Sequence, residues 1–187
     1  GYGDNSIGQN GDSCLSQFGN STLDRFGCED SDGDGWSNSG DRFPYEDSQW
    51  QDSDSDGFGD NSTGHRPDSC PDVAGSSNRD RHGGSESDDD GYSNPDANWS
   101  LADGADAFPE DPFQWADSDG DGYGDNQGVP SGDECIDEAG GSYENNTHGC
   151  PDYDFDGWAD FDDAFPEDQE QWMDTDGDGF GDNYFYT

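Results

Sequence analysis

The apolar positions of this chain are sparse, and many are aromatic residues that recur in a fixed order between polar stretches. A pentapeptide Gly-(Tyr/Phe)-Gly-Asp-Asn recurs, and a Phe-Pro pair and then a Gln-Trp pair precede each of its later copies. Between these markers Gly, Asp, Asn, Ser and Pro occur too often for long helices or strands. We therefore expect a mostly irregular, loop-rich fold with little apolar core. Short strands around Gly-Tyr-Gly or Gly-Phe-Gly and one or two helical turns after Phe-Pro complete this expectation.

The spacing of the markers predicts three repeat units, 1–61, 62–126 and 127–187. The pentapeptide begins at intervals of 56, 65 and 57 residues, at Gly1, Gly57, Gly122 and Gly179. The Phe-Pro pairs begin at Phe43, Phe108 and Phe165, and the Gln-Trp pairs at Gln49, Gln114 and Gln171. The middle unit is nine residues longer, and the extra residues fall within 95–106. Such periodicity favours an elongated tandem-repeat array in which each unit touches mainly its neighbours.

The composition of the chain excludes folding around an ordinary apolar core. It has 48 Asp and Glu residues against five Arg and no Lys, a formal net charge of −43, and only 25% hydrophobic residues. Nucleic acids and anionic membrane surfaces would repel it, and no apolar run is long enough to be inserted in a membrane. An ordinary apolar core cannot fold this chain, so it is either an acidic disordered polymer or a chain folded around bound cations. The placement of the acids favours the second interpretation.

One set of acids forms twelve-residue loops, 30–41, 86–97 and 152–163. In the first and third, side-chain oxygens occupy positions 1, 3, 5, 9 and 12, and glycine occupies position 6. The candidate ligands, with a backbone carbonyl at position 7, are Asp30, Asp32, Asp34, Trp36, Asn38, Asp41, Asp152, Asp154, Asp156, Trp158, Asp160 and Asp163. The middle loop offers Glu86, Asp88, Asp90, Tyr92 and Asn94. Its twelfth position is Ala97, so either Asp96 or Asp106 closes it.

A second set forms nine-residue loops, 52–60, 117–125 and 174–182. Their candidate ligands are Asp52, Asp54, Asp56, Phe58, Asp60, Asp117, Asp119, Asp121, Tyr123, Asp125, Asp174, Asp176, Asp178, Phe180 and Asp182. No acid stands at position 12 of these loops. An aspartate does stand eight residues after the last acid of a loop, at Asp12, Asp68 and Asp133, and we expect these to complete the sites.

Oxygen ligands on a tightly turning loop are what Ca²⁺ requires, since it takes six to eight oxygens, whereas Mg²⁺ keeps its waters. Zn²⁺ prefers nitrogen and sulfur ligands. The spacing, seen for example in 117–125, resembles that of the thrombospondin type 3 repeats. The resemblance covers nearly the whole chain and implies an extended array around a string of Ca²⁺ ions, some shared between loops. The Gln-Trp pair, the Phe-Pro pair and the insert between cysteines depart from the animal repeats and look more like acidic surface proteins of microbes.

Cysteine placement predicts two disulfides, Cys14–Cys28 and Cys135–Cys150, and with them an oxidising, extracellular setting. In unit 2, Cys70 has Gly84 where its partner would stand, and it is either an inert thiol or an intermolecular link. Four sequons, at Asn20, Asn61, Asn98 and Asn145, are candidate glycosylation sites. The recurring aromatics are interpreted as packing that joins loop to loop, with carbohydrate stacking as the lesser alternative.

No catalytic motif is present, and the periodic acids are already explained by metal binding. His65, His82 and His148 have no plausible nucleophile partner, and we expect them to be exposed. We expect an extracellular calcium-binding structural protein, a subunit of a filament or surface layer, and not an enzyme. The chain begins just after the place where the acids of a loop would stand, and a neighbouring copy or an upstream repeat would supply them. The alternatives are a rigid calcium-dependent spacer or adhesion module within a larger cell-surface protein and, third, a mineral-binding matrix protein.

Overall fold

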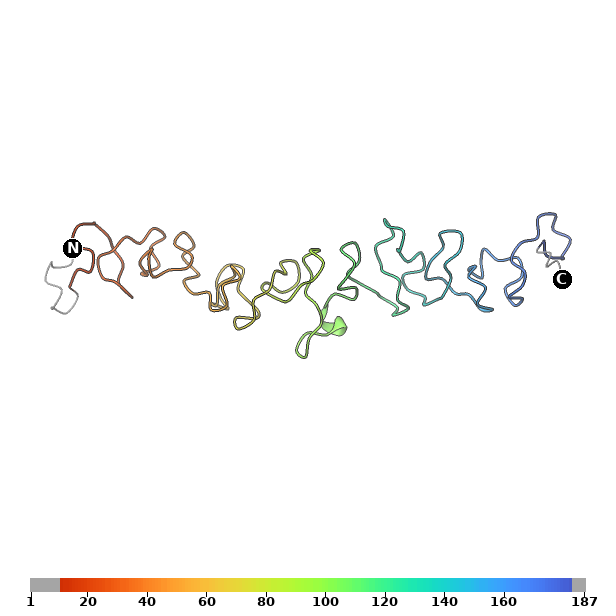
Figure 1. Ribbon diagram of the computed structural model, residues 1–187, viewed down its shortest axis with the longest axis horizontal. Coiled ribbons are helices and arrows are strands. Elements are labelled where there is room, and N and C mark those ends of the chain that lie inside the picture. The colour runs from red at the N-terminus through yellow and green to blue at the C-terminus, as the bar shows by residue number, and fades with distance from the viewer. Residues whose placement is uncertain (1–10, 183–187) are drawn as a thin grey trace. The chain divides into compact units, whose positions relative to one another are not determined.

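The computed structural model describes residues 11–182 and divides into two compact units, Gly1–Ser93 and Asn94–Thr187. Almost all of the described backbone is irregular loop and turn, as Figure 1 shows. Within 11–182 the only helical element is a single 3-10 turn, η1 (Leu101–Asp103), which lies in the insert of the middle repeat. The loop-rich fold predicted from the sequence is therefore confirmed.

The expected short strands are reduced to single bridges. Gly59 pairs with Pro67 and Gly124 with Gly132, both in parallel. The expected helical turns after Phe-Pro are also shorter, because each is one hydrogen-bonded turn in which Pro takes its favoured second position. The first is closed by the backbone nitrogen of Glu46, which donates to the Phe43 carbonyl at 2.9 Å. The same bond recurs from Asp111 to Phe108 and from Asp168 to Phe165.

The glutamine of the Gln-Trp pair fixes the pentapeptide that follows it. The buried Gln49 side chain accepts from the backbone nitrogen of Asn61 at 3.0 Å and donates to its carbonyl at 3.1 Å. Gln114 and Asn126 repeat both bonds at the same distances. A Cβ at Gly59 would lie 2.1 Å from Gln49 Oε1, so the third residue of the pentapeptide must be glycine.

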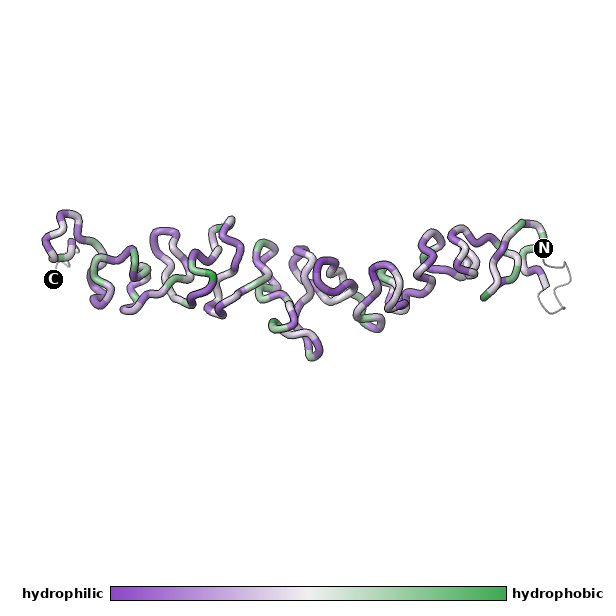
Figure 2. The backbone as a smooth tube through the Cα atoms, turned by 180° about the vertical axis from the view of Figure 1, so that it is seen from behind, coloured by the Kyte–Doolittle hydropathy of each residue, from purple (hydrophilic) through white to green (hydrophobic). Residues whose placement is uncertain are grey.

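The interior of each compact unit is polar. Among the described residues the buried hydrophobic ones are Cys28, Ala105, Cys150 and Ala159, whereas many Ser, Gln and Asp side chains are buried. Figure 2 shows hydrophilic and hydrophobic stretches alternating along the tube. Buried serines satisfy the backbone: Cys28 and Cys150 each donate a backbone N–H at 3.0 Å, to the hydroxyls of Ser21 and Ser142. This interior supplies hydrogen bonds but little hydrophobic stabilisation.

Two disulfides lie within residues 11–182, Cys14–Cys28 and Cys135–Cys150, as predicted. They suggest an oxidising, extracellular environment. Cys70 takes part in neither. The backbone around it nevertheless matches the other two segments, because Ser69 donates to the His82 carbonyl at 2.9 Å as Ser13 does to Phe26 and Glu134 to His148. Gly84 thus occupies the place that Cys28 and Cys150 occupy elsewhere.

Candidate metal centres

The side chains of the first three acids of every loop hold the loop in shape, because they accept hydrogen bonds from backbone nitrogens of the same loop. In the loop 152–163, Asp152 accepts from the nitrogens of Phe155 at 2.8 Å and Gly157 at 2.9 Å. Asp154 accepts from Asp156 at 3.2 Å, and Asp156 accepts from Trp158 at 2.8 Å. The bond from position 5 to position 3 recurs at 3.2 Å in the other five loops, at Asp32, Asp54, Asp88, Asp119 and Asp176.

Two residues of each loop lie in the left-handed region, and only one of them was foreseen. The glycine at position 6 has φ between 86° and 103° in all six loops, which explains why glycine is required there. Position 4 has φ between 63° and 85°, although it is glycine in only three loops, at Gly33, Gly120 and Gly177. The other three residues at this position are Ser55, Asp89 and Phe155.

These turns bring the carboxylates together. Oxygens of positions 1, 3 and 5 lie within 4.8 Å of one another in the groups Asp30/Asp32/Asp34, Asp52/Asp54/Asp56, Glu86/Asp88/Asp90, Asp117/Asp119/Asp121 and Asp152/Asp154/Asp156. Burial, and then the charges of neighbouring carboxylates, raise the pKa of Asp34 and Asp156. The same two causes raise the pKa of Asp54, Asp88, Asp90 and Asp119. Several of these groups can hold a metal ion.

The inward oxygens are the strongest indication of a cation. While Oδ1 binds the loop backbone, Oδ2 is buried and receives no hydrogen bond within the described part of the chain. This holds for Asp32, Asp34, Asp54, Asp88, Asp90, Asp119, Asp154 and Asp156. Buried anionic oxygens without donors are costly unless a positive charge compensates them. A bound cation supplies that charge, and the donor set is made only of hard oxygens.

The structure also places the predicted closing residues beside their loops. Asp68 and Asp133 are 5% and 1% exposed, and Oδ2 of each is buried and receives no hydrogen bond within residues 11–182. Burial raises the pKa of Asp68 to about 6. The hydrogen bond from the Cys70 nitrogen lowers this pKa, and the negative charges of Asp56, Asp54 and Asp60 raise it further. Burial likewise raises the pKa of Asp133, Asp41 and Asp163, each with added repulsion from the acids of its own loop.

The sequence leaves open whether Asp96 or Asp106 closes the middle loop, and local geometry distinguishes them. Asp106 is 1% exposed and accepts from the nitrogen of Phe108 at 2.8 Å. Asp41 and Asp163 make the same bond, to Phe43 and Phe165, at 2.7 Å. Asp96 is exposed and accepts instead from Asn98, in the turn of the insert. Asp106 therefore has the local structure of a closing residue.

Position 9 has a role that sequence reasoning missed. Asp60 accepts from both the backbone nitrogen of Ser53, at 3.0 Å, and its hydroxyl, at 2.6 Å. Asp125 binds Ser118 in the same way. Asn38 and Asp182 clamp the Ser or Thr at position 2, whereas Asp160 binds only the backbone nitrogen of Tyr153. The structure thus uses these side chains to close the loop, and their role as metal ligands, like that of Asn94, stays a prediction.

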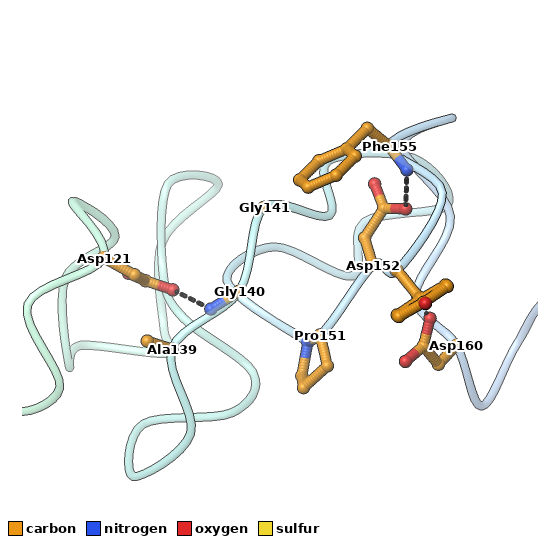
Figure 3. Close-up of a pocket in the computed structure, with 9 residues that line it drawn as sticks. Asp121, Ala139, Gly140, Gly141, Pro151, Asp152, Phe155 and Asp160 are labelled. Atoms are coloured by element: carbon orange, nitrogen blue, oxygen red, sulfur yellow. Dashed lines mark hydrogen bonds between the residues drawn. The ribbon is translucent and has the colours of Figure 1, made fainter. Parts of the chain in front are cut away.

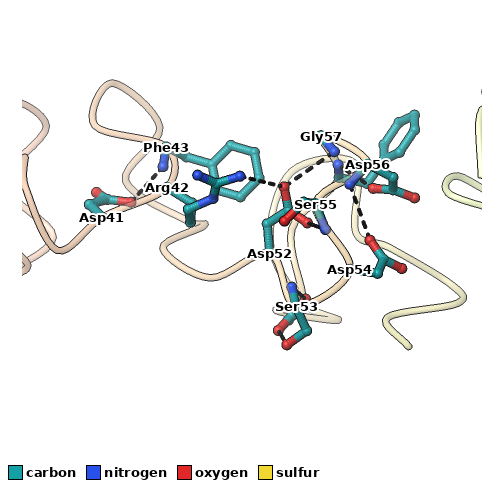
Figure 4. Close-up of polar contacts among 11 residues, drawn as sticks. Asp41, Arg42, Phe43, Asp52, Ser53, Asp54, Ser55, Asp56 and Gly57 are labelled. Carbon is teal, nitrogen blue, oxygen red and sulfur yellow. Dashed lines mark hydrogen bonds and ion pairs between the residues drawn. The ribbon is translucent and has the colours of Figure 1, made fainter. Parts of the chain in front are cut away.

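Position 5 of two nine-residue loops joins one predicted unit to the next. Asp56 Oδ2 accepts from the nitrogen of Gly75 at 3.1 Å, and Asp121 Oδ2 accepts from Gly140 at 2.9 Å. Figure 4 shows the loop 52–60, where Arg42 also lies 3.8 Å from the nearly buried Asp52 carboxylate. Both features place additional positive or polar groups beside the acids.

One aromatic residue at position 7, Trp158, packs as the sequence suggests. Trp158 stacks on Trp172 with ring centroids 6.3 Å apart. The expectation that the histidines are exposed is wrong for two of them, because His82 and His148 are half-buried against Phe58 and Tyr123 at 5.4 and 5.6 Å. The position 7 carbonyls remain predicted ligands. Two features of the sequence, the pentapeptide at 1–5 and the aromatic run 184–186, lie outside the described residues.

No protein-family model matches the chain, and no curated protein is significantly similar to it in sequence. Within residues 11–182, no helix has the length and apolar content that crossing a bilayer requires.

Proposed function

We propose that this chain is an extracellular calcium-binding structural protein without catalytic activity. The observation that carries the proposal is the set of buried loop Oδ2 atoms that receive no hydrogen bond from any residue of 11–182. Calcium fits these sites because they offer only oxygens and because one ion accepts six to eight of them. In a chain whose interior is otherwise polar, the bound ions take the place of an apolar core.

The proposed assembly is a filament or surface layer made of copies of this chain. Its support is the way in which one repeat contacts the next. The bonds from Asp56 to Gly75 and from Asp121 to Gly140 join successive predicted units by the same two groups. A head-to-tail contact of this kind builds an open filament when the rotation between copies does not close a ring.

Microscopy of the calcium-loaded and chelated protein tests this assembly. Long regular fibres that disappear with chelator are the expected result. Isolated short rods would favour the alternative, a calcium-dependent spacer or adhesion module within a larger surface protein.

Glycosylation belongs to the same proposal, and the hydrogen bonds of the candidate asparagines support an order among them. Asn20 and Asn98 are exposed. Asn61 Nδ2 instead donates to the Ser48 carbonyl at 2.8 Å, a bond that a glycan on this nitrogen would break. Asn145 Nδ2 lies 3.5 Å from Asp162. Glycopeptide mass spectrometry should find glycans on Asn20 or Asn98 before Asn61, and a fully occupied Asn61 would contradict this ranking.

A further inference from the structure

Two positions of the loop 152–163 depart from the pattern of the other five. Position 2 is Ser or Thr in those loops and Tyr153 here, and position 4 is Gly, Ser or Asp there and Phe155 here. Phe155 has φ of 63°, a region in which a bulky side chain is strained. Both side chains are more than two-thirds exposed, at 71% and 76%. Neither burial nor the geometry of the loop therefore accounts for the two aromatic rings.

Tyr153 and Phe155 line the same wide-open cavity of about 820 Å³. Figure 3 shows Phe155, Asp152 and Asp160 on one side of this space and Asp121, Ala139 and Gly140 on the other. Pro151, Gly141 and Tyr153 complete the lining. All of these residues belong to the compact unit Asn94–Thr187.

The charged part of the lining is entirely acidic. Asp121 accepts from Gly140, and Asp152 accepts from Phe155 and Gly157. Asp160 accepts from the Tyr153 nitrogen at 2.8 Å through Oδ1, but Tyr153 has no hydroxyl near its backbone to match the one by which Ser53 binds Asp60. The second carboxylate oxygen of Asp160 therefore lacks, within residues 11–182, the hydroxyl donor that Asp60 and Asp125 have.

Charge indicates what kind of ligand would complement this cavity. All five arginines precede residue 94, so the sequence 94–187 contains neither Arg nor Lys. In the other half, Arg66 lies over Phe58 and Arg79 over Tyr92, 5.3 and 5.7 Å from the ring centroids. Aromatic faces beside carboxylates attract organic cations, both through the ring quadrupole and through the negative potential.

We propose that the cavity beside Tyr153 and Phe155 binds an organic cation of the guanidinium or alkylammonium class. The rings contact the apolar faces of the cation, and Asp160 accepts a hydrogen bond or provides the counter-charge. The source is either a free small molecule or an arginine or lysine side chain of a partner polypeptide. The proposal goes beyond the proposed calcium function: Asp121, Asp152 and Asp160 belong to candidate calcium loops, whereas neither aromatic residue contributes a carboxylate to a loop.

The test is a calorimetric titration of the calcium-saturated full chain with N-acetyl-arginine amide. Its neutral analogue, N-acetyl-citrulline amide, controls for shape. Phe155→Gly and Tyr153→Ser convert each position to the residue used in other loops, so both variants should keep or raise the thermal midpoint. Phe161→Ser is the matched control, since Phe161 is also 66% exposed and lies outside the cavity lining.

We expect the arginine probe to bind and each of the two loop variants to weaken it about two- to thirtyfold, the range of a single cation–π contact. Both variants should still bind calcium, because they introduce the residues found in the other loops, so weaker arginine binding with calcium binding retained separates this proposal from the calcium proposal. A glycine-flanked single-arginine peptide that binds more tightly than the amide indicates a polypeptide source, and equal affinity indicates a free cation. Equal binding of the citrulline analogue, unchanged affinity in both variants, or binding of a methyl pyranoside in place of the cations overturns the proposal.

Discussion

The carboxylate of Asp121 accepts a hydrogen bond from the backbone nitrogen of Gly140, 19 residues further along the chain, at 2.9 Å. Its other oxygen accepts from Tyr123 within the loop 117–125. One side chain thus holds both the turn of a candidate metal centre and the start of the next repeat. Loop geometry and the contact between predicted units are therefore coupled at this residue.

Removing this side chain should loosen both structures. In Asp121→Ala, the Gly140 amide loses a charged acceptor, a bond with a net value of about 1.5 kcal/mol or more. Its hydrogen exchange should accelerate roughly tenfold, and calcium affinity of the loop should fall. Glu138→Ala, which removes an exposed carboxylate from the same segment, is the control. Unchanged Gly140 exchange in Asp121→Ala would mean that the bond does not join the repeats.

Lowering the pH should change the thermal midpoints of the metal-free and the calcium-loaded protein in opposite directions. Burial raises the folded-state pKa of Asp68 to about 6, above its ordinary value of 3.8. A raised pKa means that the folded form binds the proton more tightly, so this stabilisation is complete below about pH 4 and is lost as the pH rises through about 6. With chelator, lowering the pH from 7.5 to 5.5 should therefore raise the thermal midpoint.

With calcium present, the same acidification should lower the midpoint, because protons compete with the ion for the carboxylates. Asp68→Asn removes this titration and should flatten both profiles between pH 5 and 7. Parallel pH profiles with and without calcium would argue against carboxylate ligation at this loop.

The insert of the middle repeat allows a direct comparison of two aspartates. Asp106 is buried and bonded to Phe108 as Asp41 is to Phe43, whereas Asp96 is exposed. Asp106→Asn should reduce the number of calcium ions bound at saturation, or weaken the weakest site at least about tenfold, as expected for a lost charged ligand. Asp96→Asn should leave the isotherm unchanged. The reverse order of effects would assign the closing role to Asp96.

A third disulfide can be added where the sequence has lost one. Gly84→Cys places a thiol at the position equivalent to Cys28 and Cys150, opposite Cys70. The new Cβ would lie 2.7 Å from the Ser93 Cβ, so a small local shift must accompany the bond. We expect oxidation to remove both thiols of this variant and raise its thermal midpoint, since the closed loop restricts the unfolded chain.

Leu23→Cys, at an exposed position 47 residues before Cys70, is the matched control for this variant. Its thiols should remain reactive after the same treatment. Equal thiol reactivity in the two variants would break the proposed correspondence between Gly84 and the second cysteine of the other repeats.

The sequence predicts some features of this molecule well for a physical reason. Position 6 needs a left-handed backbone, so its glycines are visible in the sequence, and the cysteine pairs mark their own disulfides. Position 4 is equally left-handed but is filled by Ser55, Asp89 and Phe155 as well as glycine, which hides the requirement. The only sequence signal for a left-handed backbone at position 4 is that glycine alternates there with the small polar residues Ser55 and Asp89.

Other features depend on contacts across the chain and were not predictable from spacing. Asp60 and Asp125 fit the ninth position of a calcium loop by sequence, yet their oxygens are bound by Ser53 and Ser118. The recurring serine at position 2 is the signal that reveals this clamp once the structure is known. The packing of His82 on Phe58 is likewise invisible in sequence, since it brings together residues 24 positions apart.

The central claim is that bound calcium replaces the missing apolar core, and a calcium titration of the chelated chain tests it most directly. Tryptophan fluorescence and circular dichroism should change together in a cooperative, chelator-reversible transition at up to millimolar calcium, the weak end of extracellular sites. In Asp156→Ala the loop 152–163 should remain protease-sensitive at about millimolar calcium, while the other loops become resistant. No transition by roughly 10 mM calcium, or unchanged protease resistance in that variant, would contradict the account.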